Sequence, residues 1–379
     1  MTILDRVIIS LKSLGGVAKL KDIYSIYKKI SKPEEISKTF DRSIQARIEE
    51  NSQSSDAFKG EDIFRTLYGK GKGVWYLKDK FKNIEEAKFI YEFREKNIEL
   101  WEEISKKKIH SNEYLREVIK IHRGERGIYR DLSQTKKLSF NDGICLSILD
   151  TAGNYEDILT DTYLTYSYPD TKHQSRDLGE INSLKICQKY NIPIFVLLGF
   201  EDDRSKKEVR LGYVQSYNDK QKTFLISFID DKEKIINPIE EIIEDQNDEE
   251  LIQLFDNSRK KKKSTFSNRN NNQPKFNFDV FKYYENECAV CGINHFLEAA
   301  HIIPVRDKGS DDKKNGLILC KNHHKAFDDI FFKINFENYN LEIIKESKDS
   351  LKIIRGNINH LTNKPGKKFL EWRYKNYKK

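Results

Sequence analysis

The stretch CAVCGINHFLEAAHIIPVRDKGSDDKKNGLILCKNHHKAFD, residues 288–328, decides how the rest of the chain is interpreted. It contains two pairs of metal-ligand residues, Cys288 with Cys291 and Cys320 with His323, separated by 28 residues. Zinc favours four thiolate or imidazole ligands in a tetrahedron, and a Cys-x-x-Cys turn lets two sulfurs reach one ion. Cysteines that merely pack in a core rarely coincide in such pairs, so the pattern predicts a structural zinc site.

Three further polar residues lie between and beside these pairs. His301 falls in a predicted strand over 297–304, Asn315 in a turn that leads into a second strand over 316–319, and His324 in a predicted helix that starts at 323. The string Ala-His-Ile-x-Pro, Asn-Gly-Leu and Cys-x-x-His-His-x-x-Phe-Asp resembles the HNH endonucleases, with their ββα-metal site, over about residues 280–345. The resemblance implies a DNA endonuclease that hydrolyses phosphodiester bonds with Mg²⁺ or Mn²⁺.

The same resemblance implies a role for each of these residues. His301 would be the general base, Asn315 would orient His301 and fix the loop, and His324 would bind one divalent cation at the scissile phosphate. Many family members place a second metal ligand directly before the base histidine, where this chain has Ala300. Asp328, four residues after His324 on the same helical face, is the best replacement, and Glu298 is the alternative because it points to the same side of its strand as Ala300. A purely local cap or salt bridge of Asp328 stays open.

Length and composition predict an α+β multidomain protein. The chain has 379 residues, 37% of them hydrophobic and 12% aromatic, which suffices for several small cores. Residues 1–80 contain 16 Lys and Arg against 11 Asp and Glu, and residues 278–379 contain 19 against 14, so each end carries about +5. A polyanionic partner at both ends is expected, although a solvated lysine-rich surface would give the same count.

No apolar run of 18 residues occurs, and the first 16 residues lack the uninterrupted apolar core of a signal peptide. We therefore expect a cytoplasmic protein without membrane contact. The chain has five cysteines, three of them in the metal-like cluster, which fits a reducing compartment.

Residues 1–80 form the first predicted domain. Their periodicity predicts three short helices followed by a hairpin with the basic tip Gly69–Gly73. This order resembles a winged helix-turn-helix domain, which implies double-stranded DNA as the partner of the third helix and of the wing. The residues that the resemblance assigns to DNA are Arg42, Gln45, Arg47, Lys70 and Lys72. A winged helix used only for protein contacts is the alternative, and residues 81–127 are predicted to be a helical connector.

Residues 128–257 form the second predicted domain, with at least five strands and one helix in a small β-rich barrel or sheet. The region from Gly153 to Asp177 resembles the Tyr-Asp-Gly-containing region of SRA-like domains, although the Gly of that motif is absent. The resemblance implies a pocket for a modified cytosine flipped out of the duplex. The residues implied are Tyr155, Tyr166 and Tyr168 for stacking, with Asp157 or Asp161 for the base edge. A tyrosine-rich, half-buried sheet surface is the alternative.

The segment 237–257 is strongly acidic, residues 258–277 are a predicted basic flexible linker, and residues 278–379 are the predicted nuclease domain. Together the parts predict a restriction-type endonuclease whose cleavage depends on modified cytosine. One ββα-metal site cuts one strand, so double-strand cleavage requires a homodimer or two sequential nicks. A conventional sequence-specific type II or nicking endonuclease is the first alternative. A catalytically inactive, zinc-dependent DNA-binding regulator is the second.

Overall fold

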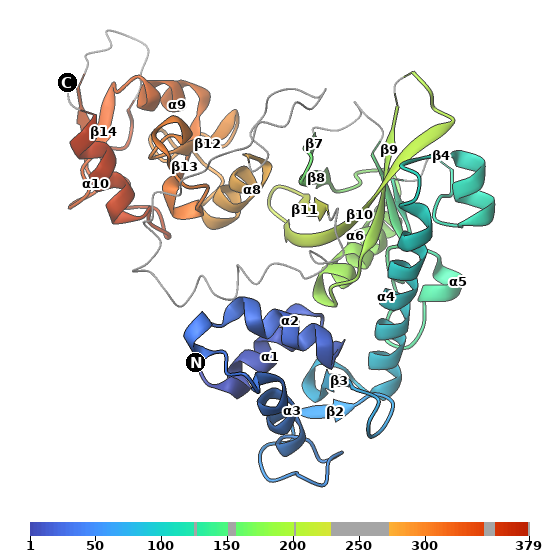
Figure 1. The fold of residues 1–379 in the computed structure, drawn as a ribbon. Helices are drawn as coiled ribbons and strands as arrows, with labels where there is room; N and C mark the ends of the chain where they lie inside the picture. Colours follow the sequence, from blue (N-terminus) through green and yellow to red (C-terminus); the bar gives the residue numbers. More distant parts are fainter. Residues whose placement is uncertain (125–126, 151–156, 201, 229–272, 345–352, 378–379) are drawn as a thin grey trace. The chain divides into compact units, whose positions relative to one another are not determined.

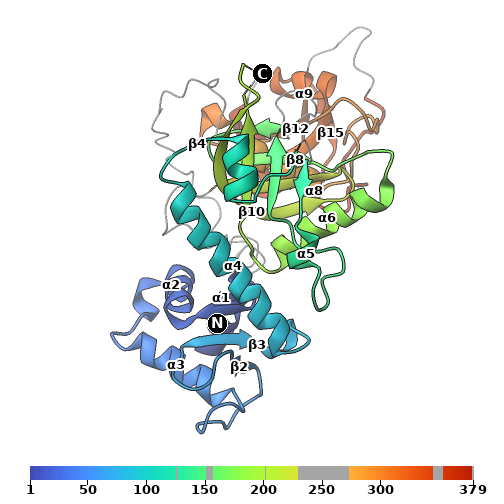
Figure 2. The ribbon, with the colours of Figure 1, turned by 90° about the vertical axis from the view of Figure 1, so that its right-hand side faces the viewer.

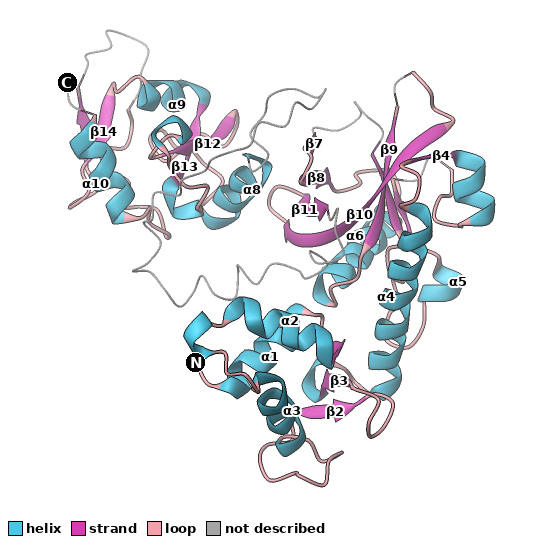
Figure 3. Ribbon diagram, in the orientation of Figure 1, coloured by secondary structure: helices cyan, strands magenta, loops and turns pink. Residues whose placement is uncertain are grey.

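The computed structural model describes residues 1–124, 127–150, 157–200, 202–228, 273–344 and 353–377 (Figures 1 and 3). The chain divides into two compact units, and the second contains every described residue from Gln273 onward. None of the helices in the described ranges combines the length and the apolar character needed to cross a bilayer.

The N-terminal 80 residues form three helices and a small antiparallel sheet with the strand order β1-β3-β2 (Figure 2). Their apolar side chains meet in one core that includes Leu11, Ile26, Ile48 and Trp75. The elements are α1 (Ile3–Ser13), β1 (Val17–Lys19), α2 (Leu20–Ile30), a 3-10 turn (Pro33–Glu35), α3 (Phe40–Glu50), β2 (Phe64–Thr66), β3 (Val74–Leu77) and a second 3-10 turn (Lys78–Lys80).

Helix α1 has a defined start and stop. Thr2 and Asp5 form a capping box, in which each side chain accepts the backbone N–H of the other. The helix ends before Gly15, which has a positive φ of +76°. A side chain at Gly15 would collide with the backbone carbonyl of Tyr190, so glycine is needed where the N-terminal helices approach the following region.

Helix α4 (Ile84–Ile104) forms the connector, and it is one helix of 21 residues rather than a pair. Asn83 caps its start by accepting the N–H of Glu86 at 2.9 Å. The buried Arg94 donates to the backbone carbonyls of Leu14 and Val17, and Asn97 donates to the carbonyl of Pro193 at 3.0 Å. The connector is therefore hydrogen-bonded to the elements on both sides of it.

The middle region is built on an eight-stranded sheet with the order β5-β6-β9-β10-β11-β8-β7, and β4 pairs with β10 off this path. Because β5 and β7 lie at opposite ends of that order, the described strands form an open sheet, and the prediction of a barrel-like closure is wrong. Its strands are β4 (Ile109–Ser111), β5 (Ile128–Tyr129), β6 (Ser147–Asp150), β7 (Ile158–Leu159), β8 (Tyr163–Ser167), β9 (Ile194–Gly199), β10 (Lys206–Asn218) and β11 (Thr223–Phe228). Its helical segments are a π turn (Tyr114–Val118), α5 (Leu132–Thr135) and α6 (Gln174–Lys189).

The C-terminal unit places a β-hairpin between helices. Strand β12 (Leu297–His301) pairs with β13 (Gly316–Cys320) in antiparallel register, and α9 (Lys321–Asp328) follows β13 directly. The other elements are α8 (Gln273–Tyr283), 3-10 turns at Val305–Asp307 and Lys313–Asn315, β14 (Phe332–Ile334), β15 (Leu341–Ile343) and α10 (Lys367–Asn376). All of these surround one core that includes Phe276, Leu317 and Phe327.

Helix α8 begins inside the range 258–277 that the sequence assigns to the linker. It packs closely on the hairpin, because a Cβ at Gly316 would lie 2.2 Å from a methyl group of Val280. Residues 258–272 of the linker and the acidic segment 237–257 lie outside the described residues.

Candidate functional site

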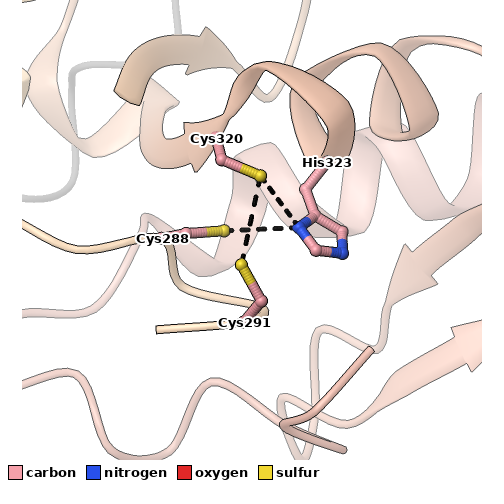
Figure 4. Close-up of side chains that lie close together, drawn as sticks. All are labelled: Cys288, Cys291, Cys320 and His323. Atoms are coloured by element: carbon pink, nitrogen blue, oxygen red, sulfur yellow. Dashed lines mark hydrogen bonds between the residues drawn. The ribbon is translucent and has the colours of Figure 1, made fainter. Parts of the chain in front are cut away.

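Cys288, Cys291, Cys320 and His323 converge in the C-terminal unit (Figure 4). Nδ1 of His323 lies 3.1 Å from Sγ of Cys320 and 3.5 Å from Sγ of Cys288, and the sulfurs of Cys291 and Cys320 are 4.0 Å apart. A zinc ion with Zn–S bonds of about 2.3 Å and a Zn–N bond of about 2.0 Å has tetrahedral edges of about 3.5–3.8 Å. The four side chains can therefore hold one metal ion, and their sizes fit zinc.

The surroundings of Cys288 favour its thiolate, whereas burial raises the pKa of Cys291 to about 12. Burial opposes ionisation of Cys288, but the hydrogen bond with His323 and backbone N–H groups around the sulfur together lower its pKa to about 6. Metal binding requires thiolates, so this arrangement favours the liganded form.

His301 ends strand β12 and lies outside the cysteine cluster. Its Nε2 lies 3.0 Å from Oδ1 of Asp311, and its side chain is only 11% exposed. The imidazole ring stacks on the ring of Phe276 from α8, with centroids 3.6 Å apart and an angle of 10° between the planes. An ionised carboxylate can only accept, so Nε2 carries the proton toward Asp311, and Nδ1 is the free acceptor of the neutral ring.

Asn315 is completely buried and fixes the loop that follows His301. Its side chain accepts the N–H of Ile303 at 2.8 Å and donates to the carbonyls of Ile303 at 3.1 Å and of Ser310 at 2.7 Å. Its backbone carbonyl accepts the N–H of Ile302 at 2.7 Å. These bonds go to the backbone and not to the imidazole, so Asn315 acts on His301 through the shape of the loop.

His324, on α9, lies between two carboxylates. Its Nδ1 lies 2.7 Å from Oε2 of Glu298 on β12, and its Nε2 lies 3.6 Å from Oδ2 of Asp328. The two carboxylates thus face opposite nitrogens of one ring. A donor bond from Nδ1 to Glu298 leaves Nε2 as a lone-pair ligand on the side of Asp328. This geometry can hold a divalent cation between Nε2 and Asp328, with Glu298 orienting the ring.

In the middle sheet the structure brings some of the predicted pocket residues together. The carboxylate of Asp157 accepts the N–H and the hydroxyl of Ser167, both at 2.7 Å, and burial raises the pKa of Asp157. Tyr166 is 7% exposed, and burial, with the charge of Asp157, raises its pKa well above the ordinary value. Asp150, which the sequence did not single out, ends strand β6, and burial together with the charge of Asp157 raises its pKa to about 6.

The other predicted pocket residues differ in exposure, and one of them is not described. Tyr168 is buried with the ammonium group of Lys185 5.8 Å from its ring centroid, and Asp161 is exposed. Tyr155 lies outside the described residues.

The residues predicted to contact DNA lie on the surface of the N-terminal domain. Arg42, Gln45 and Arg47 are exposed on α3, where Arg47 pairs with Glu50 at 2.5 Å and Gln45 donates to Glu49 at 2.8 Å. Lys70 and Lys72 are exposed in the turn between β2 and β3, and Lys70 pairs with Asp56. Arg47 and Lys70 therefore already have acidic partners within the domain.

Two neighbours of His301, Asp311 and Phe276, were not predicted from the sequence. Asp311 is one of two adjacent acidic residues in a loop, with no spacing signal toward His301, and Phe276 lies in a segment read as linker. The aromatic spacing of Phe276, Phe278 and Phe281 was the signal available for the helix.

Residues 288–335 match the family model described as HNH endonuclease. The chain carries an HNH nuclease domain. The match covers both cysteine pairs, His301, Asn315 and His324. No curated protein matches the chain.

Three solved structures are similar to the chain at low scores. A modification-dependent TagI restriction endonuclease is 16% identical with a TM-score of 0.28, over 71% of this chain and 92% of that one. The SRA domain of SUVH5 in complex with hemimethylated CG DNA is 18% identical with a TM-score of 0.23, over 32% of this chain and 85% of that one. The type IV phosphorothioation-dependent restriction endonuclease ScoMcrA is 11% identical with a TM-score of 0.21, over 86% and 78%. TM-scores this low support no functional inference, so the proposals below rest on the residues of this chain.

The two carboxylates beside His324 can be separated by isosteric variants. Glu298→Gln keeps an acceptor for Nδ1, so we expect the Mn²⁺ concentration for half-maximal DNA nicking to rise less than about 3-fold. Asp328→Asn removes the charge of the predicted ligand and should raise this concentration by at least about 10-fold, because loss of an outer-shell partner alone typically weakens metal binding 10- to 100-fold. The measurement is a Mn²⁺ titration of nicking rates for both variants. A larger effect of Glu298→Gln would make Glu298 the ligand.

Proposed function

We propose that the chain is a divalent-metal-dependent DNA endonuclease of the restriction type, directed to DNA that contains modified cytosine. The observation that carries the nuclease part is the arrangement around β12, β13 and α9. There His301 is held by Asp311, Asn315 fixes the adjoining loop, and His324 faces Asp328. A base and a cation site on adjoining elements are what phosphodiester hydrolysis requires.

In the proposed reaction, Nδ1 of His301 accepts a proton from the water that attacks phosphorus. Asp311 keeps the ring in the required tautomer and stabilises the imidazolium that forms, and Phe276 fixes the plane of the ring. A divalent cation bound by His324 and Asp328, Mg²⁺ or Mn²⁺, would stabilise the charge on the phosphate and on the departing oxygen. The ion at Cys288, Cys291, Cys320 and His323 is proposed to be zinc with a structural role.

The group of Asp157, Tyr166 and Asp150 supports the proposal that the middle sheet binds a flipped base. A flipped cytosine needs an aromatic face in place of its lost stacking and an acceptor for its amino group. Tyr166, which is 7% exposed in the structure, would supply the ring, and Asp157 or Asp150 would supply the carboxyl group. Tyr168, Tyr155 and Asp161 remain predictions.

The N-terminal domain is proposed to be a winged helix that binds DNA. The order helix, strand, two helices and two strands, with exposed Arg42, Gln45 and Arg47 on α3 and Lys72 in the β2–β3 turn, supports this assignment. Contacts of these side chains with phosphates would orient the duplex, and the proposed base pocket would distinguish modified from unmodified DNA.

The proposal is tested with one DNA sequence amplified with dCTP, 5-methyl-dCTP or 5-hydroxymethyl-dCTP. We expect at least one modified product to be cleaved about 10-fold faster than the unmodified product in Mn²⁺, because a base-edge contact contributes about 1–3 kcal/mol. Asp157→Asn should remove this preference, whereas Asp202→Asn, at an exposed position of the middle region outside the proposed pocket, should retain it. Cleavage rates come from denaturing gels, and urea unfolding of both variants controls for stability.

The outcomes separate the alternatives. Equal cleavage of all three products would indicate a conventional restriction or nicking endonuclease that reads ordinary bases. Binding of DNA without cleavage in any metal would indicate an inactive zinc-dependent regulator. The His301–Asp311 pair argues against that alternative, because a binding module does not need an oriented base. Double-strand breaks whose rate rises with the square of protein concentration would support a homodimer.

A further inference from the structure

Arg373 on α10 is a buried arginine within the C-terminal unit. It is 4% exposed, and it donates hydrogen bonds to two backbone carbonyls, those of Ile302 at 2.8 Å and of Phe327. Its guanidinium carbon lies 3.7 Å from the centroid of the Phe327 ring. Burial of a cation is destabilising unless hydrogen bonds and other contacts compensate for the lost hydration. Here the two carbonyls and the Phe327 ring provide that compensation.

The two carbonyls belong to the two halves of the proposed reaction centre. Ile302 directly follows His301, and Phe327 directly precedes Asp328 in the last turn of α9. The carbonyl of Phe327 also accepts the backbone N–H of Ile330 at 3.2 Å, so Arg373 adds a charged donor to a carbonyl at the end of α9. One rigid, planar guanidinium thereby links the strand that carries the base to the helix that carries the cation ligands.

The segment around Arg373 is fixed at both ends to the loop that Asn315 holds. The N–H of Gly366, before α10, donates to the carbonyl of Lys314 at 2.9 Å. After α10, the hydroxyl of Tyr377 bonds to the carboxylate of Asp307. Residues 366–377 thus form a strap across the hairpin loop, and the strap lies outside the range 288–335 that matches the family model.

We propose that Arg373 is a positioning residue that sets the separation between His301 and the cation site on α9. The proposal rests on the proposed nuclease function. Burial lowers the pKa of Arg373 to about 10, which leaves the guanidinium charged at neutral pH and able to donate to both carbonyls. Displacement of a catalytic group by about 1 Å costs on the order of 100-fold in rate, so a link between the two halves affects turnover more than DNA binding.

The test uses the full-length chain with Arg373→Lys and Arg373→Ala. Lysine keeps the charge but is not a planar fork, so we expect kcat for nicking to fall about 10-fold in Arg373→Lys and about 100-fold in Arg373→Ala. KM, zinc content and the urea midpoint of Arg373→Lys should stay close to wild type. Ethylguanidine, but not ethylamine, should restore part of kcat in Arg373→Ala. Lys375→Ala is the matched control, because Lys375 is exposed on the same helix, and its described contacts are an ion pair with Glu371 and the ring of Phe336, 5.9 Å from its ammonium group.

Mn²⁺ binding, followed by the EPR signal of free Mn²⁺, gives a readout that does not need cleavage. Arg373→Lys should weaken binding about 10-fold, relative to a His324→Ala reference that removes the site. If wild type and Arg373→Lys nick DNA equally, the inference fails while the nuclease function stands. If the wild type does not nick, the proposed function fails, and unchanged Mn²⁺ affinity in Arg373→Lys then overturns the inference as well. Loss of zinc together with absence of ethylguanidine rescue would also overturn it, because Arg373 would then act on folding alone.

Discussion

Replacement of His301 by alanine is expected to slow nicking of supercoiled DNA by about 100- to 10,000-fold, the usual contribution of a general base. The imidazole is oriented from two sides, by Asp311 at Nε2 and by the ring of Phe276, and alanine removes the proton acceptor without touching the metal ligands. The measurement is the initial rate of conversion of supercoiled to open-circular plasmid in Mn²⁺. DNA affinity and zinc content should not change.

The control for this prediction is His295→Ala, because His295 is an exposed histidine of the same unit and bonds only to its neighbour Asn294 among the contacts described. It should cut at the wild-type rate. The nicking rate of Asp311→Asn should lie between those of His301→Ala and His295→Ala. The amide oxygen can accept from Nε2, but it lacks the charge that stabilises the imidazolium. Wild-type cleavage by His301→Ala would remove His301 from the proposed mechanism and return the inactive-regulator alternative to first place.

The opposite directions of the two adjacent histidine side chains could be predicted from the sequence because they depend on local geometry, whereas their roles stay predictions. His323 follows Cys320 at the spacing of a metal knuckle, and successive side chains on a helix point about 100° apart. His323 therefore turns into the cysteine cluster, while His324 turns toward Glu298 and Asp328. The same locality made Asp328 recognisable at four residues from His324.

The residues that complete the centre could not be predicted, because they come from distant parts of the chain. Phe276 lies 25 positions before His301, and Arg373 reaches Ile302 from 71 positions away. Nothing in local spacing specifies such contacts, which depend on how α8 and α10 pack on the hairpin. Asp311 is closer in sequence, but only the loop fixed by Asn315 brings it to His301.

The middle region illustrates the same limit on a larger scale. The β-branched and aromatic residues over 163–168 predicted the strand that the structure has as β8, because strand periodicity is local. Whether the sheet closes into a barrel depends on which strands lie at its edges. That depends on pairings between strands distant in sequence, such as the parallel pairing of β6 with β9. The prediction of a barrel was wrong because local periodicity does not specify these pairings.

Loss of one ligand of the proposed zinc ion is the second large effect that we expect. Cys320→Ser should reduce zinc from one ion per chain to none and abolish nicking in any concentration of Mg²⁺ or Mn²⁺. Cys320 ends β13 and begins α9, so it joins the strand register of the hairpin to the helix that carries His324. Structural zinc contributes apparent free energies of about 10–16 kcal/mol in small zinc domains at neutral pH, more than a single domain can lose and remain folded.

Two measurements separate this structural ion from the catalytic one. Zinc content by atomic absorption should be unchanged in Cys187→Ala, a cysteine of the middle region, and absent in Cys320→Ser. Wild-type protein stripped with a strong chelator should stay inactive when Mn²⁺ alone is returned, and should recover when Zn²⁺ is added first, because Mn²⁺ prefers oxygen ligands to thiolates. Recovery with Mn²⁺ alone would mean that the Cys288–His323 cluster is dispensable for the shape of the centre. In that case His301 and His324 would be held by α8, α10 and the loop of Asn315 without help from the metal.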